Sequence, residues 1–207
     1  MKNLLLNQWI AIQPQKILLL EEDLVQTGIY LNTQAEENHN MLRNQLNVWL
    51  EAIAIRLNLR EKKILEVGIA GDEKPSGSYK FFGEGNDWKT LDKNSKWEPD
   101  IVADITNSEI PDDFYDLVIM TQALEHIWDY KKALSEINRI TKEYAIIDCP
   151  FKYVFHQDTI RKNQPWWEWD DYWRFTPSAF KKLLQEAGFK EVEINFNEEL
   201  TLALCKK

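Results

Sequence analysis

Short, largely apolar runs separated by polar turns recur along the chain from residue 61 onward. Runs of this length are typical of strands buried in a parallel sheet. The candidate strands are residues 63–67, 88–91, 100–103, 117–120 and 144–147. Residues 191–196 and 200–205 instead alternate in polarity around a polar turn, which predicts an antiparallel hairpin. Since helical segments alternate with the strands, we expect an α/β fold, with a mostly parallel sheet covered by helices on both faces.

Two helices within this region have clear start signals, and the second also has a stop signal. Asp129 can cap the first, in which four apolar residues recur on one side. These residues are Ala133, Leu134, Ile137 and Ile140. Thr176 can cap the second, Pro177 occupies its first position, and Gly188 ends it. The sequence therefore predicts where both helices lie between the strands.

The N-terminal residues follow a different pattern. Thr33 and Glu36 form a capping box, and apolar residues then recur at helical spacing, which predicts a helix over residues 34–58. The stretch before Thr33 fits short strands or short helices equally well. We therefore expect two parts, a largely helical N-terminal extension over residues 1–60 and an α/β domain over residues 61–207. The extension can pack on the domain, cover its ligand cleft or join two copies as a homodimer.

Composition and charge narrow the class of protein. Hydrophobic residues make up 44% of the chain and charged residues 29%, which is the balance of a globular protein. The net charge of −9 falls almost wholly within residues 61–207 and disfavours a nucleic acid partner. The two cysteines, Cys149 and Cys205, define neither a disulfide framework nor a zinc site. No apolar segment has the length of a membrane span or the form of a signal peptide, so we expect a cytoplasmic protein.

Residues that directly follow the strands carry the chemistry, because ligands of open α/β sheets bind beyond the carboxyl ends of the strands. A turn with two glycines, residues 68–71, follows the first strand, and glycine permits a positive φ and a close approach to a ligand. Asp92 after the second strand can accept both hydroxyls of a ribose, and Asp104 after the third can accept from an adenine amino group. Each carboxylate alone is more often a cap on its strand. Together, the three features in this order favour a nucleotide-type cofactor.

Five segments, taken together, resemble successive motifs of class I methyltransferases, and most closely the branch known as methyltransferase type 11. They are ILEVGIAG, TLDKNSKWEPDIVADI, DLVIMTQALEHIWDYKKALSEINRI, CPF and HQD…DYWRFTPSAFKKLLQEAGF. The resemblance covers residues 61–207. It implies a Rossmann-like, seven-stranded, mostly parallel sheet, with S-adenosylmethionine as cofactor and S-adenosylhomocysteine as product. The residues that it implies for the cofactor site are Glu66, Gly68, Ala70, Gly71, Asp92, Asp104, Ile105 and Gln122.

The chain departs from the family pattern in two segments. Residues 72–87 contain one proline and three glycines, which predict a loop in place of the usual long helix. Tyr79, Lys80 and Phe82 of this loop can line the cofactor site or simply pack the loop. The usual Lys-Pro-Gly-Gly turn before the fifth strand is replaced by residues 141–144, which we expect to form a surface turn.

Gln122, Glu125 and His126 have the spacing of side chains that share one face of a helix. In some relatives of this family, a Glu-x-x-Glu-His version of the helix holds a divalent metal. Gln122 removes one anionic ligand from that set, so a hard cation binds less well and we expect no stoichiometric metal. In the alternative with a metal, His156 can restore the missing ligand.

The segment over residues 166–174 contains four of the nine tryptophans. Aromatic faces stack on sugars or flat rings and attract cations. The residues that we expect to contact the acceptor are Trp167, Trp169, Tyr172 and Arg174. The alternative is an aromatic cluster that only holds the last helix in place. The candidate general bases are His126 first, then His156 and Asp171. We interpret Cys149 as a small apolar residue and not as a nucleophile.

The sequence leaves three functions open. The first is transfer of a methyl group to an oxygen or nitrogen atom of a small molecule, such as a sugar or a glycan precursor. The second is a cofactor-binding protein without catalysis, whose N-terminal extension makes a regulatory or interaction contact. The third is methylation of RNA or of a protein, of which the net charge of −9 disfavours RNA but not a basic protein tail.

Overall fold

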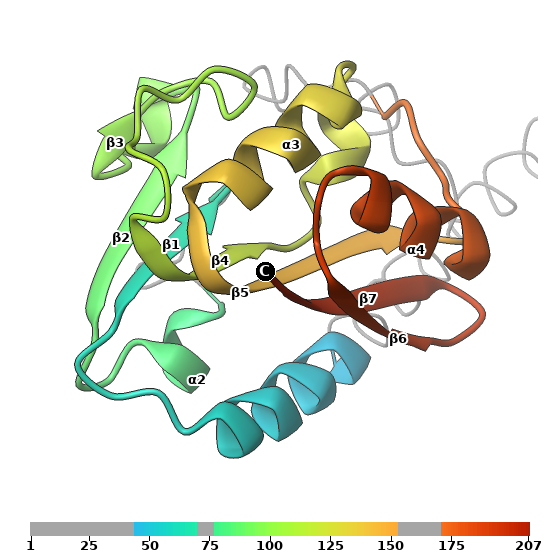
Figure 1. Cartoon of the computed structure of the whole chain (residues 1–207), viewed down its shortest axis with the longest axis horizontal. Helices are drawn as coiled ribbons and strands as arrows, with labels where there is room; N and C mark the ends of the chain where they lie inside the picture. The colour runs from blue at the N-terminus through green and yellow to red at the C-terminus, as the bar shows by residue number, and fades with distance from the viewer. Residues whose placement is uncertain (1–43, 70–76, 153–170) are drawn as a thin grey trace, which may run out of the picture. The chain divides into compact units, whose positions relative to one another are not determined.

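The computed structural model describes residues 44–69, 77–152 and 171–207. Within these ranges, seven strands form one sheet in the order β3-β2-β1-β4-β5-β7-β6 (Figure 1). Their bounds are β1 Lys63–Val67, β2 Asp87–Asp92, β3 Ile101–Val102, β4 Tyr115–Met120, β5 Thr141–Pro150, β6 Glu191–Phe196 and β7 Leu200–Lys206. Strands β1 to β5 pair in parallel, and β7 pairs antiparallel with both β5 and β6. The predicted fold class is confirmed, including the antiparallel hairpin.

The centre of the sheet is formed by the most apolar strands. All six residues of β4 are buried, as are the last four of β1, because helices cover both faces of a parallel sheet. From β1 the chain moves outward through β2 to β3, and then returns to place β4 on the other side of β1. The order of the strands therefore reverses between β1 and β4. In this architecture, ligands bind beyond the carboxyl ends of the strands at such a reversal.

Two of the helices begin where the sequence places them. The side chain of Asp129 accepts the backbone N–H of Lys132 and caps α3 (Tyr130–Ile140), whose four predicted apolar residues are buried. The hydroxyl of Thr176 accepts the backbone N–H of Ala179 and caps α4 (Pro177–Glu186). After α4, Gly188 has a φ of +111°, the conformation expected of a residue that ends a helix. Both helices lie on the same face of the sheet (Figure 1).

A further helix covers the other face, together with the short helix α2 (Figure 1). It is described over residues 44–57, which agrees with the last part of the predicted helix, and its apolar side is buried at Leu46, Leu50 and Ile53. Gln45–Lys207 form one compact unit, in which Arg56 of this helix pairs with Glu193 of β6 at 2.9 Å. The capping box at Thr33 and Glu36 lies outside the described residues, and the domain boundary at residue 60 stays a prediction.

Three expectations about local structure were wrong. The segment predicted to be all loop contains, in its described part, one short helix of four residues, α2 (Tyr79–Phe82), in which Phe82 is buried. Residues 141–144 are not a surface turn: β5 begins at Thr141 directly after α3, and the buried Thr141 hydroxyl donates to the carbonyl of Ile137. Finally, β5 runs on to Pro150, past the predicted end of this strand at residue 147, so Asp148 lies within the strand.

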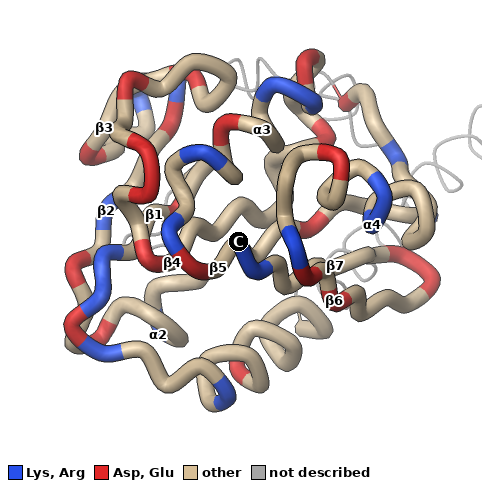
Figure 2. Tube along the Cα trace, in the orientation of Figure 1, with Lys and Arg blue, Asp and Glu red and all other residues tan. Residues whose placement is uncertain are grey.

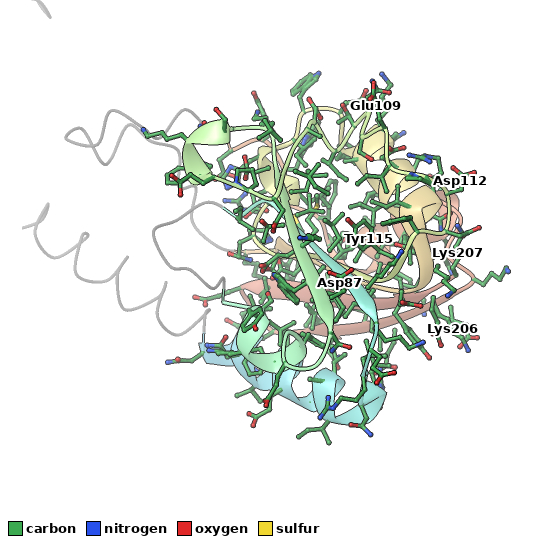
Figure 3. All side chains as sticks on the ribbon, turned by 90° about the vertical axis from the view of Figure 1, so that its left-hand side faces the viewer. Asp87, Glu109, Asp112, Tyr115, Lys206 and Lys207 are labelled. Atoms are coloured by element: carbon green, nitrogen blue, oxygen red, sulfur yellow. The ribbon has the colours of Figure 1, made fainter. Side chains whose placement is uncertain are left out.

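The end of the sheet away from the carboxyl ends of the parallel strands is held by ion pairs. Lys207 pairs with Asp113, and Arg139 of α3 pairs with Asp112, both of which lie in the loop before β4. Figure 3 labels Asp112 and Lys207, one partner of each of these ion pairs. In the described part of the chain, every helix is too short or too polar to cross a membrane.

Candidate cofactor site at the carboxyl ends of the strands

The turn after β1 requires glycine at its first position. Gly68 has a φ of +80°, and its N–H donates to the carbonyl of Leu91 at the end of β2. A Cβ at this position would lie 2.5 Å from the Cβ of Ala123, which follows β4. Gly68 therefore brings the exits of β1, β2 and β4 together at the point where the strand order reverses. The other predicted residues of this turn, Ala70 and Gly71, lie outside the described residues.

Glu66 supports this turn from within β1. Its buried carboxyl group accepts hydrogen bonds from the hydroxyl and from the backbone N–H of Ser78, just before α2. Burial raises the pKa of Glu66 to about 7, and the bonds from Ser78 oppose that rise. Glu66 thus connects β1 to the start of α2, while its predicted contact with the cofactor stays a prediction.

Two more predicted site residues are at the exits of β2 and β3. Asp92, the last residue of β2, is half-buried, and its Oδ1 accepts the N–H of Asn94 at 2.8 Å. Burial raises the pKa of this carboxyl group. Asp104 is exposed and accepts both the N–H and the hydroxyl of Thr106, so it caps the turn after β3. Ile105 beside it is buried in the core against the sheet. Of the two carboxylates, the partly buried Asp92 is therefore the better candidate for binding a ligand.

The exit of β4 is shaped by Gln122. This residue has a φ of +51°, which is uncommon for a residue with a side chain. Its backbone N–H and its Nε2 both donate to Oδ1 of Asp148, at 2.7 and 3.1 Å. The next residues form a short 3-10 helix, η2 (Leu124–His126). The expectation that Gln122, Glu125 and His126 share one helix face was therefore wrong, since Gln122 precedes the helix in a left-handed conformation.

Metal binding is not supported by the side chains in the described ranges. They contain no group of three or more histidine, cysteine or acidic side chains that can hold a metal ion. His156, the alternative ligand and base, lies outside the described residues. The absence of a stoichiometric metal thus stays a prediction.

Buried acidic groups surround the start of η2. The side chains of Glu125 and Asp148 are completely buried, and His126 Nε2 lies 3.8 Å from Glu125 Oε1. Burial, and then the nearby Asp148 carboxyl group, raise the pKa of Glu125 to about 8, and burial raises that of Asp148 to about 7. Both carboxyl groups are therefore largely or partly protonated near neutral pH.

Asp171 and Arg174 form a two-bond ion pair beside these acids. Nη2 of Arg174 lies 2.7 Å from Oδ2 of Asp171, and Nη1 contacts Oδ1. Because both carboxylate oxygens of Asp171 already contact this guanidinium group, the pairing disfavours Asp171 as the general base. The same pairing occupies Arg174, which we had expected to contact the acceptor. Cys149 is buried and its thiol pKa is raised well above the usual value, which agrees with its interpretation as a small apolar residue.

An aromatic cluster joins η2 to α4. Trp173 donates from Nε1 to the carbonyl of Ile127, and its ring packs against Tyr130 and Phe175. Phe175 stacks in turn on Phe180 of α4, so part of the cluster holds the last helix in place, as the structural alternative predicted.

The outer edge of the cluster is exposed. Trp128 is 68% exposed and contacts Tyr172, which is 40% exposed, with a ring distance of 5.3 Å. Trp128 was not among the residues predicted to contact the acceptor, although its position two residues after His126 was a usable signal. Trp167 and Trp169 lie outside the described residues.

Comparison with known proteins supports the assignment made from the sequence. A family model described as a methyltransferase domain matches residues 35–194. No curated protein matches the chain.

Among solved structures, a methyltransferase from Mesorhizobium loti, dependent on S-adenosylmethionine, has a TM-score of 0.56 and 14% identity, with 76% of this chain and 98% of that chain covered. The CurJ carbon methyltransferase has a TM-score of 0.59 and 16% identity, covering 77% and 53%. Phosphoethanolamine N-methyltransferase 2 from Haemonchus contortus, in complex with S-adenosyl-L-methionine, has a TM-score of 0.54 and 14% identity, covering 79% and 52%. At sequence identities of 14–16%, these similarities show that the chain shares its fold with the three proteins.

The family match spans most of the chain, and it includes the strand exits that meet at Gly68, Asp92 and Gln122. The chain belongs to the class I methyltransferases that depend on S-adenosylmethionine.

Proposed function

We propose that this protein transfers a methyl group from S-adenosylmethionine to an oxygen or nitrogen atom of a small molecule, with a sugar or glycan precursor as the favoured class. The observation that carries the proposal is the meeting of the β1, β2 and β4 exits at the reversal of strand order. A tight glycine turn, a desolvated carboxylate at Asp92 and the amide of Gln122 come from these three exits. These groups fit a ligand that has a ribose and an amino acid part.

The cofactor contacts follow from this arrangement. In the proposal, Asp92 accepts the ribose hydroxyls, the loop at Asp104 and Ile105 faces the adenine, and Gln122 lies beside the amino acid end. When bound, S-adenosylmethionine supplies a methyl group that its sulfonium already activates. The protein has to align an acceptor with that group and exclude water.

His126 is the proposed base for a hydroxyl acceptor. It is half-buried in η2, where its Nε2 lies 3.8 Å from Oε1 of the buried Glu125, and the exposed Trp128 follows two residues later in the sequence. Imidazole has a suitable pKa for removing a proton near neutral pH. His126→Ala should lower kcat for a hydroxyl acceptor by about 10²- to 10⁴-fold, with little change in the Kd for S-adenosylhomocysteine. Unchanged kcat in this variant rejects the base assignment.

The exposed pair Trp128 and Tyr172 supports an acceptor with a flat or saccharide ring, because aromatic faces stack on such rings. Trp167 and Trp169 are proposed to extend this surface. The relatives named above include a carbon methyltransferase and an N-methyltransferase, so the fold alone does not select the acceptor atom.

Electrostatics support a small-molecule partner over a nucleic acid. The chain has a net charge of −9. Figure 2 shows acidic and basic positions interspersed along the described trace, without a continuous basic stripe. Phosphate-rich partners require such a basic surface. Homodimer formation through residues 1–60 is proposed as well, and comparing the solution mass of the full chain with that of a chain lacking residues 1–43 tests it.

Formation of S-adenosylhomocysteine tests the function. The purified protein is incubated with S-adenosylmethionine and, separately, with sugars, sugar nucleotides, small amines, basic peptides and RNA. Saturable turnover with a sugar or an amine supports the proposal. Binding without turnover on any acceptor indicates a non-catalytic cofactor-binding protein, and turnover only with peptides or RNA indicates the macromolecular alternative. If calorimetry detects no binding of either cofactor form, the proposal is wrong.

A further inference from the structure

The conformation of Gln122 depends on a residue in another strand. Gln122 is the second residue after β4, and it precedes η2. Its φ of +51° turns the chain between these two elements. Residues with a side chain adopt this region rarely, so a specific contact has to stabilise it. That contact comes from Asp148 of β5, the neighbouring strand in the sheet.

A single oxygen of Asp148 holds both parts of Gln122. Oδ1 accepts the backbone N–H at 2.7 Å and the side-chain Nε2 at 3.1 Å. The Asp148 side chain is completely buried, so water does not compete for these bonds. The carboxyl group therefore fixes the turn and also the rotation of the amide.

The rotation of the amide decides which atom of Gln122 meets a ligand. The two ends of an amide point apart, so with Nε2 turned to Asp148, Oε1 points away from it. An amide oxygen accepts hydrogen bonds and does not donate them. It attracts an ammonium group and disfavours a carboxylate.

We propose that Asp148 is a positioning residue that orients Gln122 so that its Oε1 accepts a hydrogen bond from the α-ammonium group of the cofactor. This inference rests on the proposed function, which places the amino acid end of the cofactor beside Gln122. It adds a residue on β5 that does not touch the cofactor itself. It also states which of the two charged groups at that end Gln122 recognises.

Two ligands separate this role from a general structural one. The first is S-adenosylhomocysteine, and the second is its analogue without the α-amino group. In the wild-type protein, we expect the first to bind about tenfold or more tightly than the second, because only it can donate to Oε1. In Asp148→Ala, this ratio should fall to about one to threefold, while the Kd of the deaminated analogue changes little. A structural defect alone weakens both ligands equally and leaves the ratio unchanged.

Further variants keep the test decisive. Asp148→Asn retains an oxygen in the place of Oδ1 and should restore most of the ratio. Gln122→Ala should lower the ratio as much as Asp148→Ala does, and the double variant should lower it no further. If Asp148→Ala does not fold, as judged by its thermal transition, Asp148→Ser replaces it.

The outcomes are distinct. A wild-type protein that binds neither ligand overturns the proposed function and this inference with it. A wild-type protein that prefers S-adenosylhomocysteine, with the same preference in the folded Asp148 variant, overturns this inference alone. Loss of the preference in that variant, with rescue in Asp148→Asn, supports it.

Discussion

The Cα of Gly68 faces the methyl group of Ala123 so closely that a Cβ added to residue 68 would lie 2.5 Å from it. The contact joins the exits of two adjacent parallel strands, β1 and β4. It leaves no room for a side chain, and the φ of +80° at Gly68 adds a second reason for glycine. A side chain at residue 68 would therefore disturb both the turn of the candidate cofactor site and the packing of the sheet.

Gly68→Ala should destabilise the protein by roughly 2–4 kcal/mol, from overpacking together with the positive φ. Urea denaturation measures the loss, and calorimetry should show weakened cofactor binding at a temperature where the variant is still folded. Gly77→Ala is the matched control, because a Cβ at Gly77 meets nothing within 4 Å. Equal stability of the two variants would contradict the role of the contact with Ala123.

Asp92→Ala should weaken binding of S-adenosylhomocysteine by about 1–3 kcal/mol, since ribose hydroxyls would lose their acceptor in a partly desolvated site. Isothermal titration measures the change. Asp112→Ala is the control, because Asp112 pairs with Arg139 at the opposite end of the sheet (Figure 3). If both variants bind like the wild type, Asp92 does not hold the ribose.

Glu125 should make stability depend on pH. Its pKa is about 8 in the folded protein, against a usual value of 4.5, so the folded state binds this proton more tightly than the unfolded state. The resulting stabilisation is complete below pH 4.5 and is lost as the pH rises through about 8. Glu125→Gln carries no charge at any pH. Between about pH 5 and pH 8, the free energy of unfolding should therefore fall by roughly 3–4 kcal/mol less in this variant than in the wild type.

Urea denaturation at the two pH values measures this difference. Glu109→Gln, at an exposed position (Figure 3), serves as the control and should follow the wild-type profile. Parallel profiles for wild type and Glu125→Gln would show that the buried acid does not couple folding to protonation.

Trp128 and Trp173 should respond differently to truncation, although their rings lie 5.4 Å apart. Trp128→Ala removes an exposed ring, so stability and cofactor affinity should stay near wild type while the KM for the acceptor rises about tenfold or more. Trp173→Ala removes a ring packed against Tyr130 and Phe175, and should cost roughly 2–4 kcal/mol of stability. Thermal unfolding and acceptor kinetics are measured on both variants. A normal acceptor KM in Trp128→Ala excludes the exposed ring from the acceptor site.

The sequence was sufficient for features that depend on local chemistry. Strand ends at Gly68 and Asp92, and helix caps at Asp129 and Thr176, follow from residue type and position within a short window. The fold class follows from the order of these elements. The family resemblance then selected a site at the strand exits, where the structure places Gly68, Asp92 and Gln122.

What the sequence could not provide depends on contacts between distant residues. The left-handed turn at Gln122 requires Asp148, which lies 26 residues further along the chain. The pairing of Asp171 with Arg174 is local, but the burial that makes it significant comes from the fold. Phe82 lies in a short helix and is buried, and the glycines of its own segment do not reveal either feature.

The position of β7 has a consequence for how the chain is made. It lies between β5 and β6, so β6 joins the sheet only through a strand that follows it in sequence. Seven residues of β5, from Tyr144 to Pro150, are paired with β7 on one side. A chain that has been synthesised only as far as residue 199 therefore presents this apolar strand with an open edge, onto which a strand of another molecule can add. Until β7 has paired with β5, addition of such a foreign strand therefore competes with completion of the sheet.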